Sequence, residues 1–226
     1  MKAFLFDMDG VLVDDSQSYR KTMQKVIEFF LGIKIKNSQI QEYKNLGGFN
    51  NDWDLTFKIL LDNGISVDKN YVIEIFQKYY LGNFYTGLIK NEKWLLNLNL
   101  LKTIYSAYHT GIITGRPRKE AIYTLNRFKT EQFFSTLITM DDLPEGKAKP
   151  DPMGIIKAMR LLQIQTEQTF YFGDSVDDIS AAKRAGVIPV GVIPPGIEKT
   201  EYKHLLKSHG AQMVLNNINE IKEMVK

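Results

Sequence analysis

The first fourteen residues, MKAFLFDMDGVLVD, constrain the fold of this chain more than any other stretch. Residues 2–6 have the apolar character of a short buried strand, and that strand ends abruptly at Asp7 and Asp9. Two carboxylates one residue apart repel each other, and each is costly to bury unless a cation lies beside it. The stretch therefore predicts a buried strand whose end holds a cation, most simply Mg²⁺. A plainer interpretation is a strand-end turn that happens to be acidic.

Residues 15–88 contain several helical patterns and no convincing strand. Apolar residues recur at helical spacing from residue 16 to residue 31, and Asn51 and Asp68 are suitable N-caps for later helices. The expected helices cover residues 16–31, 38–43, 51–61 and 68–80. Such a block interrupting an alternation of strands and helices indicates an insertion into an α/β domain. We therefore expect a helical cap domain at 15–88 and a core domain formed by 1–14 and 89–226.

The remainder of the chain alternates strands with helices. Apolar runs that end in polar or glycine-containing turns predict strands at 109–114, 137–139, 169–172, 187–192 and 213–214. This alternation predicts an α/β fold with a doubly wound parallel sheet. Ligands of such sheets bind beyond the carboxyl ends of the strands.

Polar residues stand at these strand ends and before one helix. In chain order they are Asp7, Asp9, Thr114, Gly115, Arg116, Lys149, Asp174, Asp177 and Asp178. Their order and character resemble the four motifs of the haloacid dehalogenase (HAD) superfamily, in its phosphatase-like branch with a small helical cap between the first two motifs. Each motif alone is weak, but all four in order behind the right elements form a specific pattern.

The resemblance implies that this chain is a HAD-like hydrolase of phosphoric monoesters. It implies that Asp7 is the nucleophile, forming an aspartyl-phosphate, and that Asp9 is the acid and base. It further implies Mg²⁺ held by the carboxylates of Asp7 and Asp174 and by the main-chain carbonyl of Asp9. Asp178 would support the metal site through water or by orienting Lys149.

The resemblance also implies contacts to the phosphoryl group. Thr114 and the backbone N–H of Gly115 would bind its oxygens, and Lys149 would place a positive charge beside them. The family often has asparagine where this chain has Gly115. Arg116, which follows, is expected either to touch substrate phosphate or to pair with a nearby acid.

Plainer alternatives exist for the acids of the fourth motif. Asp174 could be a helix N-cap, although a cap needs one acid and the stretch has three. Asp177 is expected to be an exposed residue of the first helical turn that complements the helix dipole.

The cap contains a distinctive stretch, residues 45–53, with adjacent glycines beside aromatic residues. Glycines permit unusual backbone angles, and Gly48 and Phe49 are candidate substrate contacts. The alternative is a connecting turn with Trp53 buried in the cap.

The expected function is a Mg²⁺-dependent phosphatase acting on a small phosphorylated metabolite. A phosphomutase of the same superfamily would use the same Asp7 and Asp9. The sugar-phosphate mutases of the superfamily carry a Ser-Arg pair after the cap glycine, and Phe49 disfavours that alternative. A dehalogenase would lack Asp9. A non-catalytic binding protein would not need the complete set of motif residues, Asp7, Asp9, Thr114, Lys149 and Asp174.

Composition excludes several further kinds of chemistry and of binding partner. The chain has 226 residues, no cysteine and a formal net charge of +3. Thiolate chemistry and disulfides are thereby excluded, and the small dispersed charge does not indicate nucleic acid. No apolar run has membrane-spanning length, and no signal-peptide pattern follows Met1. We expect a cytoplasmic protein with no membrane or nucleic-acid partner, and a homodimer is left open.

Overall fold

The computed structural model describes residues 2–49 and 51–225, and the chain divides into two compact units. One unit is Met1–Val13 together with Trp94–Lys226, and the other is Asp14–Lys93. The second unit continues past residue 88 because two short 3₁₀ turns, Asn83–Tyr85 and Leu88–Asn91, follow its last α-helix.

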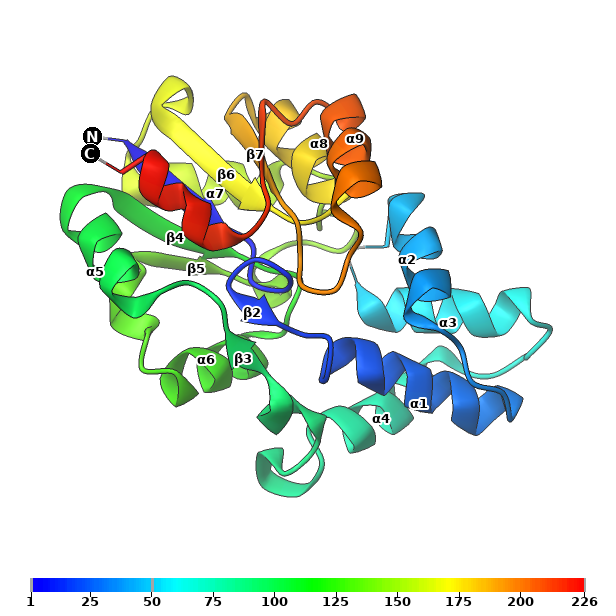
Figure 1. Ribbon diagram of the computed structural model, residues 1–226. Helices are drawn as coiled ribbons and strands as arrows, with labels where there is room; N and C mark the ends of the chain where they lie inside the picture. The colour runs from blue at the N-terminus through cyan, green and yellow to red at the C-terminus, as the bar shows by residue number, and fades with distance from the viewer. Residues whose placement is uncertain (1, 50, 226) are drawn as a thin grey trace. The chain divides into compact units, whose positions relative to one another are not determined.

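The first unit is built on a six-stranded sheet in the order β5-β4-β1-β6-β7-β8 (Figure 1). Every neighbouring pair is parallel, which confirms the predicted α/β fold. Because β1 lies between β4 and β6, the residue that follows β1 emerges at the middle of the carboxyl edge. The strands are β1 (Ala3–Phe6), β4 (His109–Ile113), β5 (Thr136–Ile138), β6 (Thr169–Gly173), β7 (Ile188–Val192) and β8 (Met213–Leu215).

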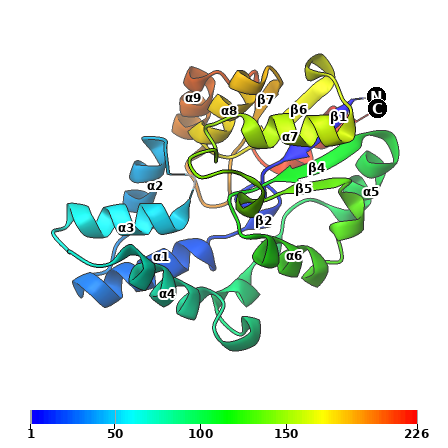
Figure 2. The same cartoon turned by 180° about the vertical axis from the view of Figure 1, so that it is seen from behind.

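Helices cover both faces of this sheet (Figure 2). Successive side chains of a strand point to opposite faces, so Phe4 and Phe6 of β1 pack in one core and Leu5 in the other. The first core includes α5 (Leu98–Ala107) and α6 (Arg118–Arg127). The second core includes α7 (Met153–Leu162) and α8 (Val176–Ala185), and α9 (Lys199–His209) packs against α8.

The second unit is helical, as predicted. Asn51 and Asp68 accept hydrogen bonds from the backbone N–H groups that open the third and fourth helices, which confirms both predicted N-caps. Its core includes Tyr19, Phe76 and Tyr80, whose rings contact one another. The helices are α1 (Tyr19–Leu31), α2 (Asn37–Asn45), α3 (Asp52–Asp62) and α4 (Lys69–Tyr80).

Two local predictions were wrong, and one small sheet was missed. Helix α1 begins at Tyr19 and not at residue 16, because Oδ1 of Asp14 accepts the N–H of Ser16 in a preceding turn. The alternation of strands and helices predicts a helix after the strand at 213–214, and this last helix is not an α-helix but a 3₁₀ helix, Ile218–Glu223. The missed sheet consists of β2 (Val13–Asp14), which pairs with β3 (Lys93–Trp94). Two-residue strands are too short to leave a periodic signal.

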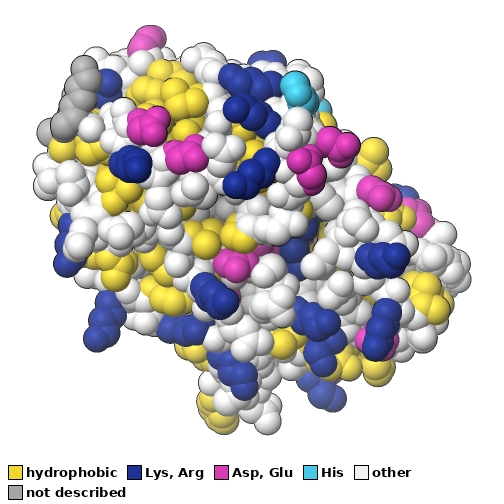
Figure 3. All heavy atoms as spheres, in the orientation of Figure 1, with side chains coloured by type: hydrophobic (Ala, Val, Ile, Leu, Met, Phe, Trp, Pro, Cys, Tyr) yellow, Lys and Arg dark blue, Asp and Glu magenta, His cyan; other side chains and the backbone are white. Residues whose placement is uncertain are grey.

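On the face drawn in Figure 3, Lys and Arg side chains are scattered among Asp and Glu side chains. None of the helices in the described ranges, 2–49 and 51–225, is both long and apolar enough to cross a membrane.

Candidate active site

Asp7 is the first residue beyond the central strand β1. Its backbone N–H donates to the carbonyl of Phe172 at 2.8 Å, so the pairing with β6 continues to this residue and holds it in place. The side chain is buried, with the residue 6% exposed. Burial raises the pKa of Asp7 to about 7, the charges of Asp178 and Asp9 add to this, and Lys149 opposes it.

Lys149 places its Nζ atom between two carboxylates. Nζ lies 2.8 Å from an oxygen of Asp7 and 2.6 Å from an oxygen of Asp178. Burial disfavours the charged ammonium, but Asp178 and Asp7 overcome this and raise the pKa of Lys149 well above its ordinary value. Lys149 therefore stays charged and is held beside Asp7. Its contact with a phosphoryl group stays a prediction.

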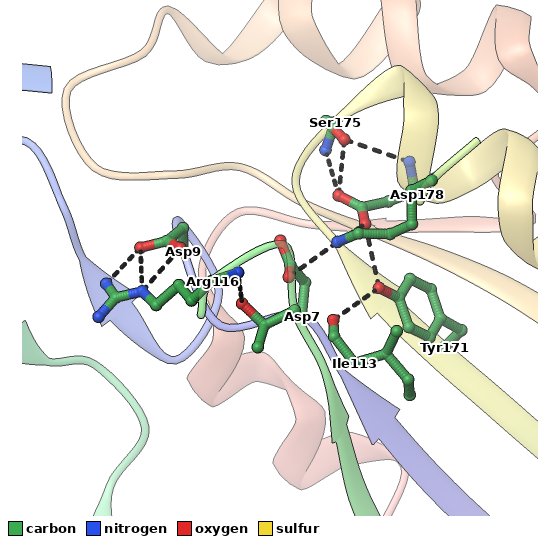
Figure 4. A network of polar contacts seen from close by, with 9 residues as sticks. Asp7, Asp9, Ile113, Arg116, Tyr171, Ser175 and Asp178 are labelled. Atoms are coloured by element: carbon green, nitrogen blue, oxygen red, sulfur yellow. Dashed lines mark hydrogen bonds and ion pairs between the residues drawn. The ribbon is translucent and has the colours of Figure 1, made fainter. Parts of the chain in front are cut away.

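Asp178 is fully buried and its carboxylate is surrounded by donors (Figure 4). One oxygen accepts from Lys149 and from the hydroxyl of Tyr171, at 2.6 and 3.0 Å. The other accepts from the N–H and the hydroxyl of Ser175, at 3.0 and 2.7 Å. Although burial raises it, the pKa of Asp178 is lowered by Lys149 and Ser175. This arrangement fits the predicted role of orienting Lys149.

Asp174 completes a group of three carboxylates. One oxygen each from Asp7, Asp174 and Asp178 lies within 4.8 Å of the others. Such an all-oxygen set fits Mg²⁺.

Two neighbours determine where Asp174 lies. Gly10, with φ of +73°, has no side chain, and a β-carbon there would lie 2.2 Å from Oδ2 of Asp174. The hydroxyl of Tyr202, on α9, donates to the main-chain carbonyl of Asp174 at 2.8 Å. Asp174 is not the N-cap of α8, because Ser175 is, and the plainer alternative for Asp174 is excluded.

Asp9 is outside the group of three carboxylates. Its side chain faces Arg116, whose Nε lies 2.9 and 3.2 Å from the two carboxylate oxygens and whose Nη2 lies 2.5 Å from one of them (Figure 4). Of the two expectations for Arg116, the structure shows the pairing with an acid. The carboxylate of Asp9 is therefore not among the grouped acids, and a metal contact through its main-chain carbonyl stays a prediction.

The turn after β4 holds Thr114, Gly115 and Arg116 in succession. The N–H of Thr114 donates to the carbonyl of Ile138 at 2.9 Å, and its hydroxyl oxygen accepts the N–H of Arg116 at 3.2 Å. The turn is thus tied to the neighbouring strand β5. Binding of phosphoryl oxygens by Thr114 and Gly115 stays a prediction.

One prediction about these motifs was wrong, and two hydroxyl groups were missed. Asp177 is buried, with 5% of its surface exposed, because the first turn of α8 faces the protein interior. Tyr171 and Tyr202 contact the acids through their hydroxyls, and neither was singled out. For Tyr171 the available signal was a phenol inside an apolar strand, since a buried hydroxyl needs a partner; Tyr202 stands among polar residues and offered no such signal.

Gly48 and Phe49 lie in the helical unit, between α2 and α3. Gly47 and Gly48 both have positive φ, and the ring of Phe49 meets that of Tyr43 edge-on at 6.5 Å. Nε1 of Trp53 is buried and has no hydrogen-bond partner within residues 2–49 and 51–225. Asn50, part of the predicted stretch, lies outside the described residues. Contact of this segment with substrate stays a prediction.

A pocket of about 280 Å³ adjoins the turn that follows β1. Gly10 forms part of its wall. The other walls come from Leu95, from the loop after β7 and from residues 216–219. The carboxyl edge of the sheet therefore has open space on the side of Gly10.

Comparison with known proteins gives consistent matches. The family model described as haloacid dehalogenase-like hydrolase matches residues 4–192. A Phytophthora nicotianae protein named imidazoleglycerol-phosphate dehydratase is 34% identical over 86% of this chain. The matched region covers 44% of that protein. The chain thus spans less than half the length of this relative.

Two further matches carry a phosphatase name. A phosphoglycolate phosphatase of Pseudomonas fluorescens is 27% identical over 83% of this chain and 68% of its own length. A solved structure described as a predicted phosphoglycolate phosphatase, from Haemophilus somnus, superposes with a TM-score of 0.78 at 18% identity, covering 100% of this chain and 98% of the other. At that identity the superposition shows the fold.

Proposed function

Because this chain belongs to the haloacid dehalogenase-like hydrolases, we propose that it is a Mg²⁺-dependent phosphatase of a small phosphorylated metabolite, working through an aspartyl-phosphate on Asp7. One observation carries the proposal. The buried carboxylate of Asp7, at the end of the central strand, has a fixed ammonium at 2.8 Å and two further carboxylates beside it. A carboxylate that could act as nucleophile, an ammonium, and oxygen atoms able to hold a metal thus lie in one place, which supports the proposal. The phosphatase names among the relatives support the same class.

Asp7 would act as the nucleophile in the first step. One of its carboxylate oxygens forms a bond to phosphorus, and the bond from phosphorus to the ester oxygen of the substrate breaks. Asp9, entering protonated, gives its proton to that departing oxygen. Lys149 offsets negative charge on the transferring group, because its ammonium is held against Asp7 by Asp178.

Water would complete the reaction in the second step. Asp9 takes a proton from the water molecule, whose oxygen attacks phosphorus while the bond to Asp7 breaks. Inorganic phosphate leaves, Asp7 is again a carboxylate, and Asp9 is again protonated. Asp7 and Asp174 would hold Mg²⁺ with the main-chain carbonyl of Asp9, and the ion would supply Lewis-acid polarisation of the phosphoryl oxygens.

The test is phosphate release from a panel of compounds, with Mg²⁺ and with EDTA. Phosphoglycolate and imidazoleglycerol phosphate belong in the panel because they correspond to the names of relatives. Glycerol phosphate and p-nitrophenyl phosphate add a simple alkyl and an aryl ester. We expect metal-dependent release with one favoured metabolite, and no release by Asp7→Asn.

Two results would contradict the proposal. Full activity of Asp7→Asn would exclude the aspartyl-phosphate, and equal rates in EDTA would exclude the metal. The remaining alternatives give their own results. A phosphomutase would convert one sugar phosphate into its isomer without releasing phosphate, and a binding protein would do neither.

A further inference from the structure

Arg116 comes from the turn after β4, but its side chain is directed to the turn after β1. The residue is only 2% exposed. Its backbone is held at two points, since its N–H donates to Oγ1 of Thr114 at 3.2 Å and its carbonyl accepts the N–H of Met140 at 3.2 Å. The guanidinium is therefore placed by a backbone that is tied to both β4 and β5.

The guanidinium has a support on one side and Asp9 on the other. Nη1 donates to Oγ1 of Thr124 on α6 at 3.0 Å, and Thr124 is fully buried. Nε and Nη2 grip both oxygens of Asp9 in the forked geometry that a guanidinium and a carboxylate share. A helix, a strand turn and Asp9 are thus connected through one rigid planar group.

Asp9 needs such a support. Its side chain is 26% exposed, and it projects from a turn. A short carboxylate in that setting can adopt several rotamers, and only some of them aim it at a departing oxygen. A misplacement of about 1 Å in a reacting group can cost a factor of about 100 in rate. The forked contact leaves the carboxyl group of Asp9 one orientation. Its Oδ2 accepts one hydrogen bond, from Nε of Arg116, and the second lone pair of Oδ2 can hold the proton that Asp9 gives and takes.

We infer that Arg116 is the positioning residue of Asp9, with Thr124 holding its guanidinium, and that it does not bind the substrate phosphate. This inference rests on the proposed function, in which Asp9 protonates the departing oxygen. It predicts that loss of the fork harms only those reactions that need the proton.

The experiment compares two substrates of one enzyme. Phosphoglycolate releases an alkoxide, which needs protonation, whereas p-nitrophenyl phosphate releases a stable phenolate, which needs little help. We expect Arg116→Lys to lower kcat/KM for phosphoglycolate by about 100-fold and for p-nitrophenyl phosphate by less than about threefold. If phosphoglycolate is a poor substrate, the favoured alkyl phosphate of the panel replaces it.

Three further variants sharpen the comparison. Asp9→Asn should show the same selective loss to a greater extent, and Thr124→Val a smaller one. Arg118→Lys is the matched control, because Arg118 is two residues away and pairs with Asp142 instead. It should leave both substrates unaffected. Equal losses for both substrates in Arg116→Lys, with a raised KM, would mean that Arg116 binds phosphate and would overturn the inference.

A second measurement is independent of turnover. The midpoints of urea unfolding are compared for Arg116→Met, Asp9→Asn and the double variant, with Mg²⁺ removed by EDTA. The contact predicts that the double variant loses less than the sum of the two single losses. Additive losses would overturn the inference. If the wild type releases no phosphate from any compound, the proposed function has failed, and this cycle still tests the contact.

Discussion

A β-carbon on residue 10 would lie 2.2 Å from Oδ2 of Asp174, so Asp174 reaches the turn after β1 only because Gly10 has no side chain. Asp174 and Asp7 are the proposed carboxylate ligands of Mg²⁺, and the identity of residue 10 therefore controls the geometry of the metal site. Gly10, in the first motif, thus permits both the turn after β1 and the position of Asp174 in the fourth motif.

Gly10→Ala should therefore weaken metal binding. The left-handed backbone at residue 10 costs about 1–2 kcal/mol for any residue with a β-carbon, and the clash displaces Asp174 in addition. We expect the displacement of Asp174 to cost at least about 1.4 kcal/mol of binding free energy, so the Mg²⁺ concentration for half-maximal activity should rise at least about tenfold. Titration calorimetry with Mg²⁺ checks the binding directly.

Gly32→Ala is the control for Gly10→Ala. Gly32 has a similar φ of +70°, and a β-carbon there would meet nothing within 4 Å. The control should lose similar stability while its Mg²⁺ affinity stays the same. An equal loss of affinity in both variants would show that backbone strain, not the contact with Asp174, is responsible.

Lys149→Met should destabilise the protein when metal is absent. The substitution removes the cation from between Asp7 and Asp178 and leaves their carboxylates buried without it. Breaking a buried ion pair in this way costs about 3–5 kcal/mol. Urea denaturation in EDTA measures the loss.

Asp178→Asn provides the matching variant for Lys149→Met. In the double variant a positive and a negative buried charge are removed together. We therefore expect its loss of unfolding free energy to be smaller than the sum of the two single losses by more than about 0.5 kcal/mol. Losses that add within that margin would mean that Lys149 and Asp178 do not support each other.

Tyr202→Phe should weaken Mg²⁺ binding without abolishing it. The hydroxyl of Tyr202 donates to the main-chain carbonyl of Asp174, and its removal leaves the loop that carries Asp174 less firmly held. Loss of such a bond costs about 1 kcal/mol, and we expect the Mg²⁺ dissociation constant to rise about fivefold. Calorimetry in the absence of substrate measures the constant.

Tyr80→Phe is the comparison for Tyr202→Phe, because the hydroxyl of Tyr80 is also bonded in a buried setting, to Glu92. This variant should lose comparable stability and retain the metal affinity. If the two variants shift the Mg²⁺ constant equally, Tyr202 has no special role at Asp174.

Asp142 should contribute acid sensitivity to the first unit. Burial raises its pKa, but the N–H and hydroxyl of Thr139 and the guanidinium of Arg118 prevail and lower it below the ordinary value of 3.8. A carboxyl group with a lowered pKa in the folded state stabilises the protein above the unfolded-state value, and this contribution is lost as pH falls through the folded-state value. The loss therefore occurs below about pH 4.

Asp142→Asn should accordingly flatten the dependence of unfolding free energy on pH in that acid range. Arg118→Ala should flatten it less, since both donors of Thr139 remain. Urea unfolding at a series of pH values below 5 measures both slopes. A wild-type slope in Asp142→Asn would contradict the assignment.

The strands and the four motifs could be predicted because their signals are local. Apolar runs that stop at Asp7, Thr114 or Gly173 mark strands and their ends within a few residues, and parallel strands deliver these ends to one edge. The two-residue pair β2 and β3 could not be predicted, because so short a pairing leaves no pattern in the sequence.

The contacts inside the site depend on residues far apart in the chain. Arg116 and Asp9 are separated by 107 positions, and nothing local to either residue decides whether the guanidinium meets a carboxylate or a phosphate. The burial of Asp177 was missed for a related reason, since the orientation of α8 depends on how it packs against the sheet.

The sequence by itself determined the fold class, the helical unit, the family and which residue types meet at the sheet edge. The fold class and the helical unit follow from periodicity and turn residues, and the family follows from the resemblance of the four motifs; all of these are signals within short stretches of chain. Only the tertiary structure decided which charge faces which: Lys149 between Asp7 and Asp178, Arg116 on Asp9, and Asp174 against Gly10. Each of these pairings depends on side-chain packing between distant segments, and a few tenths of an ångström there separate a hydrogen bond from a clash.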